Sequence, residues 1–478
     1  MLAKNLLKNF IFLLGGSIVG QIFYFIAIIY LARILGPAGF GHWNFAQALM
    51  LYLFRINEIG LEVTGIREVS RFPSDTSLWI SNITIIRLAL AIFLFIIISL
   101  FSWGGFFPVQ SSKLVILFSL AVFPTAITLE WVFEAHQNLR IVGLSRIIKG
   151  LVFFLLILFL VNDVHDIELS IIAYVVSLCI PVLIIAWILL KRYKWSSSKE
   201  FISSAKIIIW NTLPIGVATI LLQYCLFLAT IILGYQRSDL ELGYYTAAHR
   251  LVVFVWAYVM VSANRVLLPT LSRYHSESHD AFSMLVAKYF RLSTIVIIPI
   301  GLIAVALADV VLPLLYTAMY NQSIYIFKIL ICAMVIALVR SIFEIALIAS
   351  DRQRSFLVNM IFLAVTYSII TPFMIFQYGI VGAAISAVIA EISGFVFMIV
   401  KYPVSDKMKI VNPFLKSIGA GLLSVCTLLI IPESQIVLRL LLCLSVYIYI
   451  LVLLKVVSSK DWNYIVNIFQ KKEETVFM

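Results

Sequence analysis

The sequence predicts an all-α integral membrane protein, and three observations lead to that prediction. Of its 478 residues, 63% are hydrophobic and only 12% are charged, whereas about a quarter of the residues in a soluble domain are charged. The mean hydropathy is +1.08. The apolar runs extend over about 20 residues without alternating, which is the pattern of transmembrane helices rather than of barrel strands.

We expect about fourteen transmembrane helices, with two short polar loops as the longest connections. The first apolar run is too long for the core of a cleavable signal peptide, so we expect it to be retained. The expected spans are 9–34, 43–67, 79–102, 113–133, 144–161, 168–190, 206–235, 242–268, 289–314, 323–349, 356–376, 379–401, 411–431 and 435–457.

The distribution of charge predicts the orientation of these spans. Lys and Arg gather in the connections that follow even-numbered spans, such as residues 191–199 and 401–409. The connection between spans five and six contains Asp163, Asp166 and Glu168 but no Lys or Arg. The positive-inside rule then places both termini in the cytoplasm. The net charge of +12 therefore reflects topology rather than a surface for nucleic acid.

The sequence lacks the signature motifs of several function classes. The sequence contains neither the G-x-x-x-x-G-K-[ST] phosphate loop of ATP motors nor the H-E-x-x-H motif of metalloproteases. Its five cysteines lie in apolar runs without paired spacing, which argues against a metal site or a disulfide framework. We expect no cofactor and no metal, and because the loops leave no room for a catalytic domain, we expect a protein that is not an enzyme.

The stretch from Tyr30 to Arg71 is the most informative part of the chain. It ends one apolar helix, turns through a segment rich in Gly and Pro (residues 36–41), and begins a second helix that contains charges. Steps of three and four residues predict one shared helical face, because such residues lie above one another on a helix. Charge at membrane depth is costly, so this face should line a wet cavity. The residues on it are Gln47, Leu51, Arg55, Glu58 and Glu62.

The chain also contains an internal repeat. A shift of 202 residues places Gln21 on Gln223 and Gly41 on Gly243, and a shift of 214 places Glu130 on Glu344. We therefore expect two six-helix bundles in the same orientation, residues 1–200 and 201–405, followed by two further spans and a cytoplasmic tail in residues 406–478. In transporters built from such repeats the substrate site lies between the halves.

These motifs resemble a known family. The segments ARILGPAGFGHW and IGLEVTGIREVSR, together with FEAHQNLR, ASDRQRS and GIVGAA, are similar to those of Wzx-type polysaccharide flippases in the multidrug/oligosaccharidyl-lipid/polysaccharide exporter superfamily. The resemblance implies a V-shaped fold of two six-helix bundles, with alternating access. It also implies transport of undecaprenyl-diphosphate-linked oligosaccharide across the bacterial inner membrane for O-antigen, capsule or exopolysaccharide synthesis.

The resemblance leaves other functions and partners open. A multidrug or toxin cation antiporter and a lipid II flippase are the alternatives within the superfamily. Without an ATP motif, the driving force would be H⁺ or Na⁺, the substrate gradient, or the membrane potential. Expected partners are membrane lipids, a polysaccharide polymerase and a chain-length regulator, with no nucleic acid. The sugar itself cannot be read from these motifs.

The candidate site residues are polar groups inside the expected spans. Arg55 is the strongest candidate for binding a diphosphate or an acidic sugar, since Arg forms bidentate hydrogen bonds with such groups; its alternative role is an ion pair with Glu58. The other expected substrate contacts are Arg250, His249, Gln47 and Arg87. Buried carboxylates can carry a proton or bind a cation, so the candidates for ion coupling are Glu58, Glu62, Glu130 and Glu344.

Overall fold

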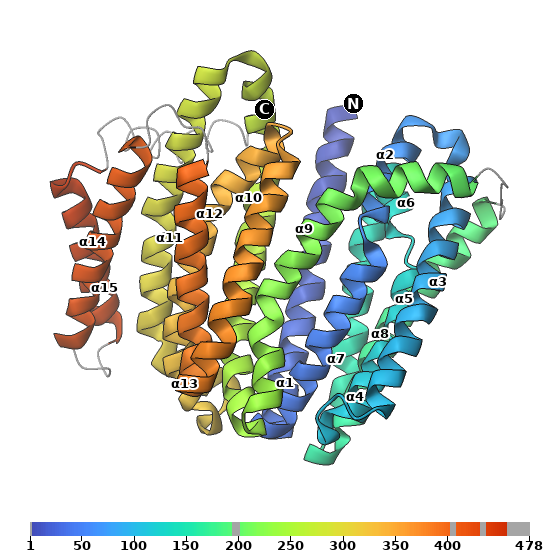
Figure 1. The fold of residues 1–478 in the computed structure, drawn as a ribbon, viewed down its shortest axis with the longest axis horizontal. Coiled ribbons are helices and arrows are strands. Elements are labelled where there is room, and N and C mark those ends of the chain that lie inside the picture. Colours follow the sequence, from blue (N-terminus) through green and yellow to red (C-terminus); the bar gives the residue numbers. More distant parts are fainter. Residues whose placement is uncertain (1, 194–200, 402–407, 431–435, 457–478) are drawn as a thin grey trace. The chain divides into compact units, whose positions relative to one another are not determined.

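The computed structural model describes residues 2–193, 201–401, 408–430 and 436–456 and contains no β-strand within them (Figure 1). The helices are α1 (Leu2–Glu58), α2 (Leu61–Arg71), η1 (Pro73–Asp75), α3 (Thr76–Trp103), α4 (Val109–Ser119), α5 (Val122–Ala126), α6 (Glu130–Ala135), α7 (Leu139–Leu160), η2 (Val164–Asp166), α8 (Ile167–Arg192), α9 (Phe201–Gln236), α10 (Asp239–Glu277), α11 (His279–Tyr316), η3 (Ala318–Tyr320), α12 (Gln322–Ala349), α13 (Gln353–Lys401), α14 (Met408–Ile430) and α15 (Ile436–Leu453). The predicted all-α membrane fold is confirmed.

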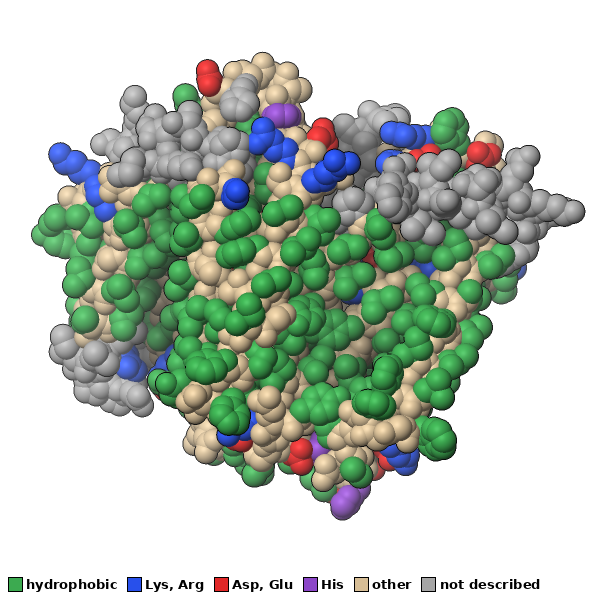
Figure 2. Space-filling view, viewed as in Figure 1, with side chains coloured by type: hydrophobic (Ala, Val, Ile, Leu, Met, Phe, Trp, Pro, Cys, Tyr) green, Lys and Arg blue, Asp and Glu red, His purple; other side chains and the backbone are tan. Residues whose placement is uncertain are grey.

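The helices have the length and composition of membrane spans. Within the described residues, ten helical stretches are long and apolar enough to cross a membrane, and the two longest contain 60 and 49 residues. Each of these two is more than twice the roughly 20 residues that one crossing needs. The exact count of fourteen stays a prediction. In Figure 2, hydrophobic side chains cover the flanks of the helices, whereas charged side chains gather near helix ends.

Each of the two long stretches is divided by a glycine with positive φ. In α1, Gly36 has φ 64° and ψ 177° and is followed by Pro37, so the chain turns there between two helical segments. In α13, Gly379 has φ 60° and ψ −137° and divides that helix in the same way. These angles are accessible to glycine at little cost but strain other residues. The turn expected after Tyr30 therefore occurs, and Gly36 makes it.

A second break, which the sequence pattern did not predict, follows Glu58. Ile59 and Gly60 have φ of 32° and 80°, and α2 begins only at Leu61. The expectation that one continuous helical face extends from Gln47 to Glu62 is therefore wrong beyond Glu58. The break separates Glu62 from the face of Arg55 and Glu58, and Glu62 pairs with Arg87 on α3.

The chain divides into two compact units. The first comprises Met1–Arg250, Leu312–Ile326 and Gln353–Ala390. In it, one apolar core forms around Trp131, Val132 and Leu61, where α2, α3 and α6 meet. Another forms where α9 packs against α13 around Met360 and Leu363.

The second unit comprises Leu251–Val311, Phe327–Arg352 and Glu391–Met478. Its core contains an aromatic group of Phe290, Phe343, Phe395 and Phe414 with centroid distances from 4.4 to 6.4 Å. The C-terminal helices α14 and α15 pack against α11 in this unit (Figure 1). The division into two six-helix bundles and an added pair of helices stays a prediction.

Candidate functional site

A seam of glycines joins α1 to α7 in the first unit. A Cβ atom added to Gly20 would lie 2.1 Å from the carbonyl oxygen of Arg146, and one added to Gly150 would lie 2.0 Å from that of Gly20. Gly16 meets Gly143 in the same way, at 2.6 Å. Small residues let helix backbones touch inside membranes. The seam therefore brings the polar side chains on the adjoining faces of α1 and α7 close together.

A pocket of about 410 Å³ lies beside this seam. Its volume is within the range of roughly 300–1,000 Å³ that is typical of small-molecule sites. Four helices, α1, α6, α7 and α8, contribute to its wall. The lining residues are Ser17, Gly20, Gln21, Tyr24, Glu130, Arg146, Lys149, Gly150 and Tyr174.

Each of the three guanidinium nitrogens of Arg146 contacts a neighbouring side chain. It donates from Nη1 to Ser17 Oγ at 3.0 Å and from Nη2 to Glu134 Oε1 at 3.3 Å. Its Nε lies 3.6 Å from Glu130 Oε2, and Glu130 also accepts a hydrogen bond of 2.6 Å from Ser145. The positive charge of Arg146 is thus balanced by carboxylates.

Lys149 and Gln21 line the same pocket with their polar groups unused. Within the part of the chain that the structure describes, neither side chain forms a hydrogen bond or an ion pair. The Lys149 ammonium lies 5.9 Å from the centroid of the Tyr174 ring, at the outer limit of a cation–π contact. The ring of Tyr24 packs edge-on to that of Tyr174, with centroids 6.4 Å apart.

Arg250 lies next to this pocket and is held by neutral groups. It donates to Asn44 Oδ1 from Nε and Nη2 at 3.1 and 2.5 Å, to Gln47 Oε1, and to the Tyr24 hydroxyl at 3.3 Å. The guanidinium carbon lies 5.1 Å from the centroid of the Trp43 ring. No carboxylate among the described residues lies within ion-pair distance of Arg250. Its charge is therefore available to an anion.

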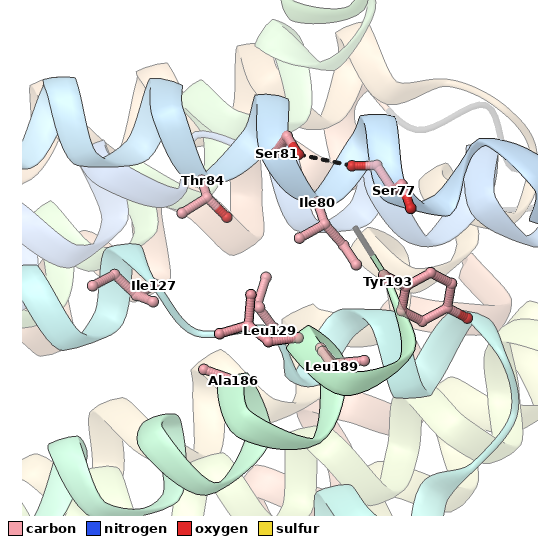
Figure 3. A pocket seen from close by; sticks show the side chains of 10 residues that line it. Ser77, Ile80, Ser81, Thr84, Ile127, Leu129, Ala186, Leu189 and Tyr193 are labelled. Carbon is pink, nitrogen blue, oxygen red and sulfur yellow. Dashed lines mark hydrogen bonds between the residues drawn. The ribbon is translucent and has the colours of Figure 1, made fainter. Parts of the chain in front are cut away.

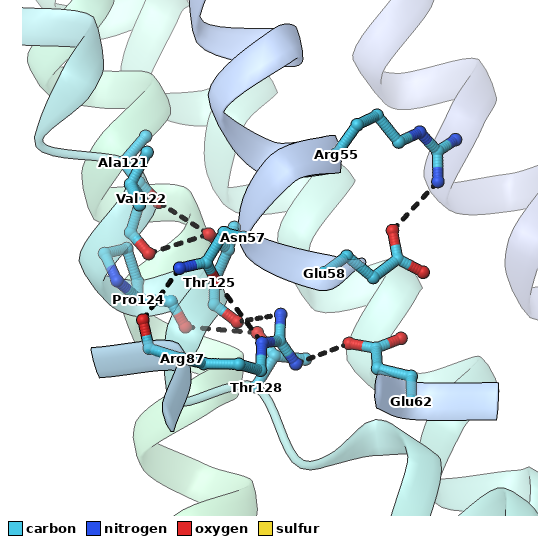
Figure 4. Close-up of polar contacts among 10 residues, drawn as sticks. All are labelled: Arg55, Asn57, Glu58, Glu62, Arg87, Ala121, Val122, Pro124, Thr125 and Thr128. Atoms are coloured by element: carbon cyan, nitrogen blue, oxygen red, sulfur yellow. Dashed lines mark hydrogen bonds and ion pairs between the residues drawn. The ribbon is translucent and has the colours of Figure 1, made fainter. Parts of the chain in front are cut away.

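The other arginines that the sequence singled out are paired with carboxylates (Figure 4). Arg55 forms an ion pair of 2.9 Å with Glu58, and the Arg55 side chain is 45% exposed. Arg87 donates to Glu62 Oε1 at 2.7 Å, to the carbonyl oxygen of Thr125 at 2.7 Å and to Asn57 Oδ1 at 3.3 Å. The Arg87 side chain is only 4% exposed. This geometry favours a structural role for Arg87 and leaves Arg55 accessible.

His249 packs among aromatic rings instead of joining Arg250. Its ring stacks on Tyr245 at 5.5 Å with an interplanar angle of 13° and meets Phe227 edge-on at 5.5 Å. Gln47 is buried and binds both Arg250 and Tyr24. Of the predicted substrate contacts, the structure therefore brings together Arg250 and Gln47. Arg55, Arg87 and His249 each contact other residues instead.

The four carboxylates expected to couple an ion occupy separate places. Glu58 and Glu62 pair with Arg55 and Arg87, and Glu130 lines the pocket. Glu344 lies in the second unit, where it and Glu391 both accept hydrogen bonds from Arg340. All three of these side chains are buried, so this group is an ionic cluster in the core of that unit.

Sequence reasoning missed several members of the site, among them Gln21, Tyr24, Asn44, Arg146 and Lys149. Arg146 and Lys149 lie within the expected span 144–161 and on α7, one helical turn apart, but neither was a candidate site residue. Their i, i+3 spacing beside the glycines of the same helix was the available signal. Nothing in the sequence distinguishes Tyr24 from the other 20 tyrosines of the chain.

Two further features lie in the first unit. A smaller pocket of about 110 Å³ lies between α3 and α8, and its lining includes Ile80, Ile127, Leu129 and Leu189 (Figure 3). Elsewhere, the turn of α1 packs against the start of α10. A Cβ added to Gly41 would lie 2.7 Å from the carbonyl oxygen of Asp239, and one added to Gly243 would lie 1.9 Å from that of Pro37.

His42 lies at this packing contact and connects three helices. Its Nδ1 lies 2.9 Å from Ser111 Oγ on α4, and its Nε2 lies 3.2 Å from Asp239 Oδ2 at the start of α10. The contact between α1 and α10 therefore combines close backbone packing with polar side chains.

Comparisons with known proteins agree with this architecture. The model of a family described as "Polysaccharide biosynthesis protein" matches residues 6–275. A protein of Escherichia coli (strain K12) named "Putative O-antigen transporter" is 28% identical over 145 residues, which are 30% of this chain and 35% of that protein. The match therefore spans about a third of the relative's length.

Solved structures share the fold at low sequence identity. The lipid II flippase MurJ in an inward closed conformation superposes with a TM-score of 0.73 and 13% identity, covering 93% of this chain and 98% of that one. A multidrug resistance MATE family transporter of the MOP superfamily in an inward-facing conformation gives a TM-score of 0.63 and 16% identity, covering 84% and 98%. At these identities the likeness shows the fold alone.

Proposed function

Because this chain belongs to the family of polysaccharide biosynthesis proteins, we propose that it is a flippase for undecaprenyl-diphosphate-linked oligosaccharides. It is a multi-pass membrane protein. In this proposal it resides in the bacterial inner membrane with both termini in the cytoplasm, is not an enzyme, and translocates repeat units for a surface polysaccharide by alternating access.

The observation that supports this function is that Arg250 has no carboxylate partner among the described residues. A guanidinium inside a membrane protein is costly unless a partner compensates its charge. Arg250 has neutral hydrogen-bond acceptors only, and its guanidinium carbon lies 5.1 Å from the centroid of the Trp43 ring. A diphosphate supplies the missing negative charge and can accept charge-assisted hydrogen bonds. An organic cation, the substrate of a multidrug antiporter, would be repelled by the same group.

Energy coupling is a separate part of the proposal. The sequence has no ATP-binding motif, so H⁺, Na⁺ or the membrane potential acting on the charged substrate would supply the driving force. Glu130 is the carboxylate best placed for coupling, because it lines the pocket next to Arg250's partner Tyr24. Glu130 lies 3.6 Å from Arg146, and Glu58, Glu62 and Glu344, which are also paired with arginines, do not line this pocket.

Deletion of the gene in its native host tests the function class. A viable deletion strain that lacks a surface polysaccharide supports the proposal. Lysis would indicate a lipid II flippase, and sensitivity to dyes with intact polysaccharide would indicate a drug antiporter. Either of the last two results would refute the proposal.

Complementation of that strain tests Arg250. We expect Arg250→Gln to reduce polysaccharide export at least tenfold while the protein remains in the membrane, and Arg250→Lys to retain part of the activity as a point charge. The control is Arg273→Gln, which removes an arginine whose side chain is 79% exposed. Normal export by Arg250→Gln would exclude Arg250 as the anion contact.

A further inference from the structure

The pocket beside Arg250 presents polar groups that its own residues leave unused. Lys149 and Gln21 form no hydrogen bond or ion pair within the described residues, whereas Arg146 is occupied by Ser17, Glu130 and Glu134. Unused donors next to an open volume are the features of a binding site for a small polar group. The pocket therefore has free hydrogen-bonding capacity.

The composition of the wall restricts what can bind. An ammonium group and an amide supply donors, the Glu130 carboxylate and the amide oxygen supply acceptors, and the rings of Tyr24 and Tyr174 supply apolar surface. Each hydroxyl of a sugar both donates and accepts hydrogen bonds, and the C–H face of a sugar ring packs on an aromatic ring. A mixed wall of this kind fits a sugar.

The same wall is unfavourable for a second anion. Glu130 faces the pocket with its charge, and Arg146 is already neutralised by Glu130 and Glu134. The charges of Lys149 and Arg146 are matched by those of Glu130 and Glu134, so the pocket has no net positive charge with which to compensate a buried carboxylate or phosphate. A neutral sugar needs no such compensation.

Tyr24 joins the pocket to Arg250. Its ring lines the pocket, and its hydroxyl accepts hydrogen bonds from Arg250 at 3.3 Å and from Gln47 at 2.9 Å. We propose that the pocket binds a neutral sugar of the lipid-linked substrate while Arg250 binds the diphosphate to which that sugar is attached. This inference rests on the proposed function and adds the chemical class of the sugar.

Binding measurements with two lipids test the proposal. Purified protein in lipid nanodiscs is titrated with undecaprenyl diphosphate, which has no sugar, and with undecaprenyl-diphosphate-linked N-acetylglucosamine. We expect Lys149→Met and Gln21→Leu each to weaken binding of the sugar-bearing lipid about tenfold, or about 1.4 kcal/mol, and to leave binding of the sugar-free lipid unchanged. Arg250→Gln should weaken both.

A matched control separates the pocket from a general effect of charge. Lys113→Met removes a lysine of the same unit whose side chain is 69% exposed and paired with Glu168. It should leave both affinities unchanged. Unchanged binding of the sugar-free lipid also shows that the Lys149→Met protein is folded.

Four results would overturn the proposal. Lys149→Met could weaken the binding of both lipids equally, which would place the diphosphate in the pocket. Both pocket variants could bind the sugar-bearing lipid as tightly as the wild type, which would exclude the pocket as the site of the sugar. The wild-type protein could bind a lipid with glucuronic acid more tightly than one with N-acetylglucosamine. This result would show that the pocket prefers an acidic sugar to a neutral one. Finally, the wild-type protein could bind neither lipid, and this result alone would refute the proposed function as well.

Discussion

Replacing Arg87 by methionine should destabilise the protein, because Arg87 holds three groups from different parts of the first unit. It binds Glu62 on α2, the backbone of Thr125 in α5 and Asn57 in α1 (Figure 4). Removing one partner of a buried ion pair costs about 3–5 kcal/mol. Since the Glu62 side chain is 29% exposed and water can reach it, we expect the lower end, about 3 kcal/mol.

The double variant Arg87→Met/Glu62→Leu isolates the contribution of the charge. With both partners removed, no uncompensated carboxylate remains, so we expect the double variant to recover at least half of the lost stability. The control is Arg55→Met. Both members of the Arg55–Glu58 pair are partly exposed, and an exposed pair contributes about 0–1 kcal/mol.

Unfolding of the purified proteins in detergent micelles measures these differences, and polysaccharide export measures function. We expect loss of export in Arg87→Met to parallel loss of folded protein. If Arg87→Met unfolds like the wild type but no longer supports export, the structural role is refuted. Arg87 would then be the substrate contact that the sequence pattern indicated.

Two further predictions concern packing and the second unit. Gly243→Ala should destabilise the protein by about 1–3 kcal/mol, as overpacking does, because its Cβ would meet the Pro37 carbonyl oxygen at 1.9 Å. The control is Gly15→Ala, whose Cβ would have nothing within 4 Å. It should be neutral or stabilising by up to about 1 kcal/mol. Equal unfolding of the two variants would contradict this. Arg340→Met should cost about 3–5 kcal/mol because its partners Glu344 and Glu391 are only 11% exposed, and unfolding like the wild type would exclude this ionic cluster as a source of stability.

The helical architecture could be predicted because hydropathy and glycine positions determine it locally. Apolar runs of about 20 residues must satisfy their backbone hydrogen bonds within the helix, and Gly36 followed by Pro37 permits a turn that other residues resist. Gly16 and Gly20 form a small-xxx-small pair, a pattern that indicates close helix packing, and the structure shows their partner to be α7. These features depend on neighbours in sequence.

The site could be predicted only in part, because its contacts join distant segments. Helical spacing paired Arg55 with Glu58 correctly, since these residues are one turn apart. The same spacing placed Glu62 on that face, but the positive φ of Gly60 ends the helix first. Glu62 then pairs with a residue 25 positions away. The partner of Arg250 lies about 200 residues away, and helical periodicity carries no information on that scale.

The contact between α1 and α10 bears on how such a chain could arise. The shift of 202 residues on which the predicted repeat rests also pairs Pro37 with Asp239 and Gly41 with Gly243. The contact is reciprocal: Gly41 meets the Asp239 carbonyl, and Gly243 meets the Pro37 carbonyl. Such reciprocity is the property of an isologous interface between two identical copies. In an ancestor of half the length, one glycine would have served both sides of a homodimer. Duplication and fusion would then have freed the two copies to diverge around a contact that still requires a glycine on each side.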